Sequence, residues 1–75
     1  MAKTLKQIDQ EAGKLLRAAR KNSGMSQADL AHECEISFQQ IQKYEEGHNR
    51  ISISRLVQMA RALQIKPADL LPADA

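Results

Sequence analysis

The sequence predicts a compact all-α domain of five short helices. Apolar residues recur at intervals of three and four along most of the 75 residues, which is the spacing of one helical face. Ser or Thr followed three residues later by Asp or Gln recurs near the starts of these segments, as in a helical capping box. The sequence has no alternating strand pattern, no internal repeat and no low-complexity linker.

Size and composition limit the class of protein. A chain of 75 residues has room for one small core, and with one Phe, one Tyr and no Trp that core must be aliphatic and rich in Ala. No apolar run approaches the roughly 18 residues of a membrane span, and the N-terminus lacks the apolar region of a secretory signal. A single Cys cannot form an intrachain disulfide. We therefore expect a cytoplasmic protein with no membrane partner.

The charge is mildly basic. The formal net charge is +2 and the sequence pI is about 8.9, which is weak evidence for a nucleic-acid partner. Its distribution is more informative, because Lys14, Arg17, Arg20 and Lys21 cluster before the middle of the chain. The cluster fits either a nucleic-acid partner or the ordinary solvated face of a helix.

Two starts are open for the first helix. Thr4 with Gln7 forms one capping pattern, and Asp9 is a second suitable N-cap. Gly13 costs about 1 kcal/mol relative to Ala inside a helix, so the segment before it could fray. We place the helix at about 10–22, with 5–9 as an optional extension. Residues 1–8 are then an N-terminal segment, 9–71 the domain and 72–75 a C-terminal tail.

The stretch 26–47 predicts two capped helices joined by a tight turn. The capping patterns are Ser26 with Asp29 and Ser37 with Gln40, and they open helices at 27–34 and 38–46. Gly47 can take a positive φ and end the second helix. Two such helices this close in sequence predict a helix-turn-helix at the second and third helices of the domain.

Two further helices complete the prediction. His48, Asn49 and Arg50 form a polar loop, after which Ser52 or Ser54 caps a fourth helix that ends at Leu63. Pro67 is tolerated in a first helical turn, so 67–71 predicts a short fifth helix.

Catalytic and metal-binding patterns are absent from the sequence. His32 and Cys34 are two positions apart, so on a helix they point in different directions and cannot bind one ion together. The sequence contains no CxxC or HExxH motif and no Gly-rich phosphate loop. We therefore expect no enzyme, no metal, no cofactor and no small-molecule ligand.

The third predicted helix carries a face suited to reading DNA. If Ile41 and Tyr44 face the core, donor-rich and aromatic side chains share the opposite face: Phe38, Gln39, Gln42 and Lys43. Gln can pair with adenine, Lys can donate to guanine, and an aromatic ring can contact a thymine methyl group. The alternatives are a merely polar surface, or a Phe38 that folds back onto the core.

The spacing of many residues resembles the XRE family, the Cro and lambdoid-repressor type of helix-turn-helix protein. The residues that carry the resemblance extend from the first helix to the fourth: Gly13, Leu16, Arg17, Arg20, Ser26, Gln27, Leu30, Ala31, Ile36, Ser37, Ile41, Tyr44, Glu45, Gly47, Leu56, Met59, Ala60, Ala62 and Leu63. The resemblance implies a lambda-repressor-like domain. It also implies a bacterial or phage transcriptional regulator that binds double-stranded DNA as a homodimer on a palindromic operator.

The resemblance also implies roles for individual residues. Those matching base-contacting positions, or sharing their exposed face, are Ser37, Phe38, Gln39, Gln42 and Lys43. Those matching contacts to the sugar-phosphate backbone are Gln27, Asn49 and Arg50. Arg20 and Glu45 match a structural ion pair between the first and third helices.

Glu35 departs from the family pattern. The family usually has Gly in this turn, where the backbone takes a positive φ, and another residue there costs roughly 1–2 kcal/mol. The sequence therefore predicts that Glu35→Gly stabilises the domain.

Two other functions and the dimer surface remain open. One alternative is the antitoxin of a toxin–antitoxin pair, although we see no tail that would wrap a toxin. The other is a protein-interaction module on the same fold, because fold does not fix function. For the dimer surface the sequence offers Leu5 and Ile8 near one end, and Leu70 and Leu71 near the other.

Overall fold

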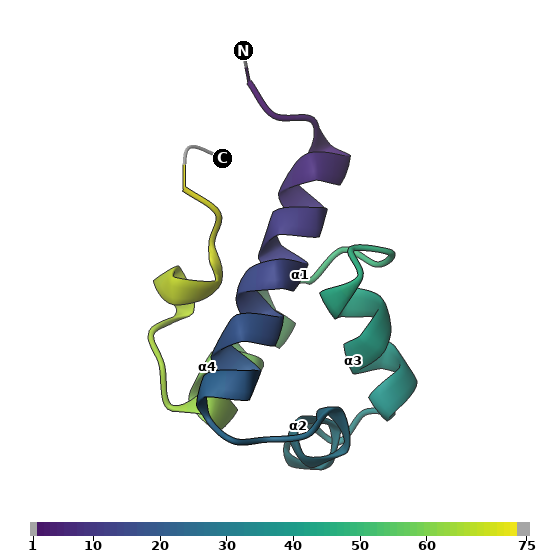
Figure 1. The fold of residues 1–75 in the computed structure, drawn as a ribbon, viewed down its shortest axis with the longest axis vertical. Coiled ribbons are helices and arrows are strands. Elements are labelled where there is room, and N and C mark those ends of the chain that lie inside the picture. Colours follow the sequence, from purple (N-terminus) through teal and green to yellow (C-terminus); the bar gives the residue numbers. More distant parts are fainter. Residues whose placement is uncertain (1, 74–75) are drawn as a thin grey trace.

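The computed structural model describes residues 2–73 and has four α-helices followed by one 3-10 turn (Figure 1). The elements are α1 (Leu5–Asn22), α2 (Gln27–Cys34), α3 (Phe38–Glu45), α4 (Ile53–Leu63) and the 3-10 turn η1 (Pro67–Leu70). Residues 2–73 contain no strand, so the all-α prediction is confirmed for them. Positions 1 and 74–75, which include the end of the predicted tail, lie outside the described residues.

The prediction of a fifth α-helix is wrong. Residues 67–70 form only a 3-10 turn, in which the Leu71 N–H donates to the Ala68 carbonyl at 3.1 Å, three residues back. The reason is length, since Pro67 lacks an N–H and Pro72 follows directly after Leu71. This segment is too short for a regular run of α-helical hydrogen bonds.

The first helix begins at the earlier of its two predicted starts. Thr4 is the N-cap, its hydroxyl accepts from the Gln7 N–H at 3.1 Å, and the Gln7 side chain accepts from the Thr4 N–H at 2.8 Å. Both halves of the capping box are formed, so residues 5–8 belong to α1. Asp9 lies inside the helix.

The predicted capping box of α2 forms completely, whereas that of α3 forms by half. At α2, Ser26 and Asp29 exchange two hydrogen bonds of 2.9 Å each. At α3, the Ser37 hydroxyl accepts from the Gln40 N–H at 3.2 Å, and within the described residues no bond returns from the Gln40 side chain. The α3 helix ends at Glu45, one residue earlier than predicted, because Gly47 at φ +74° turns the chain away.

The start of α4 is settled in favour of Ser52. Its hydroxyl accepts from the Arg55 N–H at 3.1 Å, whereas Ser54 is the second residue of the helix.

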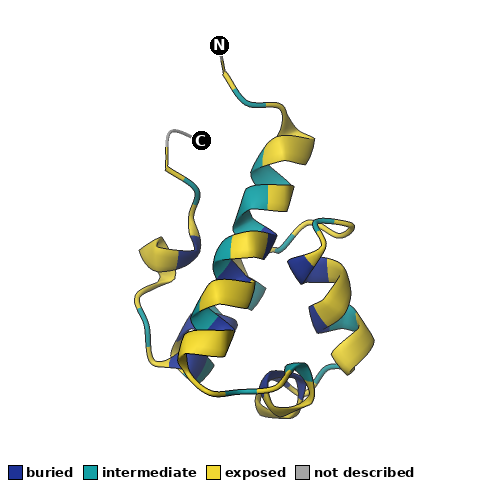
Figure 2. Cartoon of the chain, viewed as in Figure 1, coloured by how far each residue is buried: buried dark blue, intermediate teal, exposed yellow. Residues whose placement is uncertain are grey.

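Every element contributes at least one fully buried aliphatic side chain to a single core. These side chains are Leu16 of α1, Leu30 of α2, Ile41 of α3, Met59 of α4 and Leu70 of η1. Figure 2 shows the buried positions on the facing sides of the helices, with exposed positions outward. The aliphatic core expected from composition is therefore present.

Gly13 is required by close packing of α1 against α3. A Cβ atom at Gly13 would lie 2.3 Å from the carbonyl oxygen of Tyr44 and 2.7 Å from that of Glu45. Both neighbours are backbone atoms, which cannot move aside as a flexible side chain can. Gly13 therefore sets the distance between α1 and the end of α3, and α1 is continuous through it.

Two helices end in a left-handed residue that is not glycine. Glu35 after α2 has φ 56° and ψ 40°, as expected from the family pattern, and Gln64 after α4 has φ 58° and ψ 41°. In each case the next residue donates its N–H five residues back, from Ile36 to Ala31 and from Ile65 to Ala60, at 3.0 Å. The left-handed Gln64 was not predicted from the sequence.

Candidate nucleic-acid interface

The α3 helix has one buried set of side chains and one exposed set. Ile41, Tyr44 and Glu45 are buried against the rest of the domain. All the residues predicted to contact bases are exposed: Ser37, Phe38, Gln39, Gln42 and Lys43. They lie together on the helix surface because α3 turns its apolar stripe toward α1 and α2.

The exposed side chains of α3 are available to contact a partner. The Phe38 side chain is not folded into the core, since Phe38 is 47% exposed. Within the described residues, the side chains of Gln39, Gln42 and Lys43 make no hydrogen bond or ion pair. Their donors and acceptors are therefore available to a partner, and an aromatic ring lies at the N-terminal end of the same helix.

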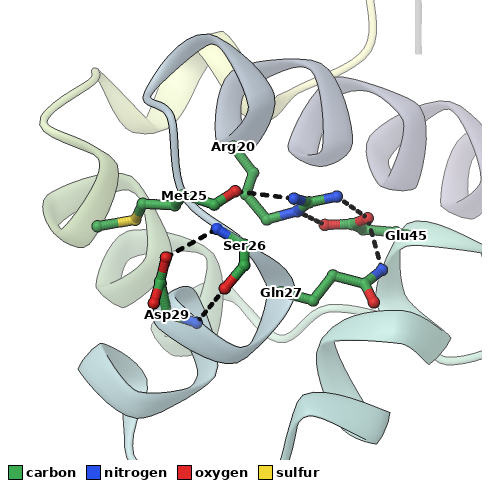
Figure 3. A network of polar contacts seen from close by, with 6 residues as sticks. All are labelled: Arg20, Met25, Ser26, Gln27, Asp29 and Glu45. Atoms are coloured by element: carbon green, nitrogen blue, oxygen red, sulfur yellow. Dashed lines mark hydrogen bonds and ion pairs between the residues drawn. The ribbon is translucent and has the colours of Figure 1, made fainter.

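A buried ion pair fixes the other side of α3. The Arg20 Nε donates to Glu45 Oε2 at 2.6 Å and its Nη2 donates to Glu45 Oε1 at 3.0 Å. Arg20 Nη1 also donates to the Met25 carbonyl at 2.9 Å. The hydrogen bonds to Glu45 raise the pKa of the Arg20 guanidinium above its ordinary value, although burial acts in the opposite direction. The pair joins α1, the segment before α2 and the end of α3 (Figure 3).

Gln27, predicted to contact phosphate, is held inside this network. It is the first residue of α2 and its side chain is half-buried. Its Nε2 donates to Glu45 Oε1 at 3.0 Å, so the amide is ordered by the protein itself (Figure 3). The sequence pattern identifies both Gln27 and Glu45 but contains no signal that the two side chains are in contact.

The predicted backbone-contacting residues Asn49 and Arg50 lie in the exposed loop between α3 and α4. Arg50 Nε is 3.2 Å from Asp9 Oδ2 of α1, and the Arg50 side chain is 64% exposed. An exposed pair of this kind contributes little to stability, about 0–1 kcal/mol, so Arg50 can exchange its partner at small cost.

A contact that was not predicted from the sequence holds the turn of the helix-turn-helix. Gln58 Nε2 and Arg55 Nη1, both on α4, donate to the Cys34 carbonyl at 3.1 and 3.4 Å. This carbonyl belongs to the last residue of α2, directly before the left-handed Glu35. The spacing of Arg55 and Gln58 placed them on one helical face, but nothing in the sequence indicated which element that face meets.

Possible metal ligands, the single cysteine and the apolar character of the helices bear on other functions of residues 2–73. No group of three or more His, Cys, Asp or Glu residues is placed to bind a metal ion there. Cys34 is buried, and this burial raises the pKa of its thiol. None of the helices over residues 2–73 is both long enough and apolar enough to cross a membrane.

The family is decided by comparison with known proteins. A helix-turn-helix family model matches residues 16–70, from the middle of α1 through η1. The chain belongs to the XRE family of helix-turn-helix proteins.

Relatives in this family are similar across most of the chain. An uncharacterized transcriptional regulator in the ATPase CF(0) region of Rhodospirillum rubrum is 43% identical over 72 residues, covering 96% of this chain and 66% of that protein. The crystal structure of the restriction-modification controller protein C.AhdI from Aeromonas hydrophila matches with a TM-score of 0.79 and 29% identity. That match covers 83% of this chain and 94% of the controller.

The XRE fold also occurs within a longer enzyme. Hydroxypropylphosphonic acid epoxidase from S. wedmorenis matches with a TM-score of 0.83 and 22% identity, over 89% of this chain but 36% of the enzyme chain. This similarity shows the fold alone.

The chain spans only part of the length of its relatives. It covers 66% of the Rhodospirillum relative and 42–47% of the rhizobial and rickettsial regulators that it matches.

Proposed function

We propose that this XRE-family protein is a sequence-specific DNA-binding transcriptional regulator that binds a palindromic operator as a homodimer. In this proposal α3 enters the major groove, and the protein acts in the cytoplasm without catalytic activity or a cofactor. The names of its relatives support the regulatory role, since those relatives are described as transcriptional regulators and as a restriction-modification controller.

The single observation that carries the proposal is the open face at the start of α3. In a helix-turn-helix, the N-terminal residues of the second helix contact base edges in the major groove. The residues proposed for this task are Phe38, Gln39, Gln42 and Lys43, with Ser37 at the edge. Two amide side chains, one ammonium group and one aromatic ring supply the donors, acceptors and apolar contact that distinguish base pairs.

Contacts to the sugar-phosphate backbone would position the domain. We assign them to Gln27 at the start of α2 and to Asn49 and Arg50 in the loop after α3. Such contacts set register and orientation but carry no sequence information.

The test of the function is a selection of bound sites from random duplex DNA. A repressor-like dimer should enrich a palindrome whose half-sites are about 34 Å apart, one helical turn of DNA. Binding to the enriched site should weaken as salt concentration rises, because phosphate contacts release counterions. A protein-interaction module that needs no DNA would enrich no site.

Two lysine variants distinguish recognition of bases from the general effect of positive charge on DNA binding. Lys43→Ala should change the enriched sequence, because it removes a donor from the face of α3. Lys6→Ala removes the same charge from an exposed position in the first turn of α1 and should leave the preference unchanged. Gln27→Ala should weaken binding to every duplex alike. Identical preferences for the wild type and Lys43→Ala would refute the assignment of Lys43.

A further inference from the structure

The Arg20–Glu45 pair does more than join α1 to α3, because a third side chain shares its carboxylate. Glu45 Oε1 accepts from both Arg20 Nη2 and Gln27 Nε2, each at 3.0 Å. The Glu45 side chain is 3% exposed and that of Arg20 is 9% exposed. Solvent therefore competes little for these hydrogen bonds, and the position of Glu45 is set by the protein.

Glu45 also decides which way the amide of Gln27 faces. A carboxylate only accepts hydrogen bonds, so the nitrogen of the Gln27 amide must face it and the amide oxygen must point away. One of the two Nε2 protons is used in this bond. The second proton stays available to an acceptor outside the network, and its direction is fixed by the first.

The place of Gln27 makes a phosphate the suitable acceptor. Gln27 is the first residue of α2, where backbone N–H groups point out of the helix and the helix dipole favours negative charge. Its side chain is half-buried, so part of the amide reaches solvent at this end. A mobile Gln would lose rotamer freedom on binding, whereas one already held by Glu45 loses less.

We propose that Glu45, itself held by Arg20, is a positioning residue that orients the Gln27 amide toward a DNA phosphate. This inference rests on the proposed DNA-binding function. It assigns the buried pair a part in binding affinity that is separable from its part in stability. Arg20 offsets the negative charge of Glu45, which would otherwise repel the phosphate that Gln27 is to contact.

The first test compares two substitutions that remove the same charge. Glu45→Gln replaces one of the two acceptor oxygens by an amide nitrogen, so Arg20 and Gln27 compete for a single acceptor and the hold on the Gln27 amide weakens. Glu46→Gln removes one negative charge from the neighbouring exposed position. If charge alone mattered, both variants would bind DNA more tightly than the wild type. We expect Glu46→Gln to bind DNA at least as tightly as the wild type. We expect Glu45→Gln to bind about tenfold more weakly than the wild type, because losing one hydrogen bond to a charged group changes affinity by about this factor.

The second comparison asks whether the effect passes through Gln27. Gln27→Met keeps the length of the side chain but removes its amide. In that background Glu45→Gln should cause no further loss on either the enriched operator or a random duplex. The dependence of affinity on salt should keep its slope in Gln27→Met, because the lost contact is uncharged. A loss from Glu45→Gln that persists in Gln27→Met would mean that Glu45 acts only through the fold, and would overturn the proposal.

The third readout uses the unaltered protein without DNA. The 15N relaxation of side-chain amides should give a higher order parameter for Gln27 Nε2 than for the exposed Gln39 and Gln42. Equal order parameters would overturn the proposal even if Glu45→Gln proved too unstable to assay. A wild type that enriches no duplex would overturn the proposed function. A wild type that binds, with Glu45→Gln behaving like Glu46→Gln, would overturn the positioning role alone.

Discussion

Replacing Glu35 by Gly should stabilise the domain. Glu35 has φ 56° and ψ 40°, the left-handed conformation that costs a residue with a Cβ atom roughly 1–2 kcal/mol. Gly avoids this cost but loses more backbone entropy on folding, roughly 0.5–1 kcal/mol. Glu35 is exposed and within the described residues its side chain forms no hydrogen bond or ion pair. The net gain should therefore be on the order of 0.5–1 kcal/mol.

The assay is urea and thermal denaturation followed by circular dichroism. In a domain of this size a gain of about 1 kcal/mol raises the melting temperature by roughly 4–8 °C, so Glu35→Gly should raise it by about 2–8 °C. The dependence of the unfolding free energy on urea should keep its slope, because the exposed surface barely changes.

Two controls separate the backbone from the charge. Glu35→Ala removes the carboxylate but keeps a Cβ atom in the left-handed conformation, so it should give little gain. Gly24→Ala is the reverse change: Gly24 has φ +72° and a Cβ atom there would meet nothing within 4 Å. Only the conformational cost remains, so this variant should lose about 1 kcal/mol. A melting temperature that falls in Glu35→Gly, or rises equally in Glu35→Ala, would refute the reasoning.

Three further predictions concern packing, the buried pair and pH. Gly13→Ala should destabilise the domain by about 1–3 kcal/mol in urea denaturation, although Ala is the better helix former; unchanged stability would contradict the close contact. Arg20→Met and Glu45→Met should each lower the free energy of unfolding by about 3–5 kcal/mol, and the double variant should lose clearly less than the sum of the two. If the two losses simply add in this double-mutant cycle, the two side chains are not coupled. The hydrogen bonds from Ser26 lower the pKa of Asp29. The ionised carboxylate therefore contributes to stability above the unfolded pKa of about 4, and this contribution is lost as pH falls through the lower folded pKa. Denaturation at a series of pH values should accordingly show a smaller acid loss of stability in Asp29→Asn; an equal loss would contradict this assignment.

Most of the fold could be predicted because its signals are local. The capping pairs at Thr4 and Ser26 each lie within four residues, and the structure forms both. The apolar spacing gave the buried faces, and α2 has the predicted bounds. The error at 67–71 has a local cause as well, because an apolar residue after Pro-Ala-Asp fits a 3-10 turn as well as it fits an α-helix.

The candidate site could be predicted residue by residue but not as a set of contacts. The exposed face of α3 follows from its own periodicity. The bond from Gln27 to Glu45 joins residues 18 positions apart, and those from Arg55 and Gln58 to Cys34 join residues 21 and 24 apart. Such bonds depend on how helices pack, which propensity and spacing do not encode.

Gly13 shows how packing can reverse the meaning of a local signal. Within one helix a glycine is a weak point, so the sequence pointed to fraying before Gly13. In the folded domain the same missing side chain lets α1 approach the carbonyl groups of Tyr44 and Glu45, where a Cβ atom would collide. Glu45 is the partner of Arg20, which lies on the same helix as Gly13, so this approach of α1 to α3 suits the bond between them. The residue that costs the isolated helix about 1 kcal/mol is therefore the one that lets α1 pack closely against the end of α3, where the Arg20–Glu45 pair joins the two helices.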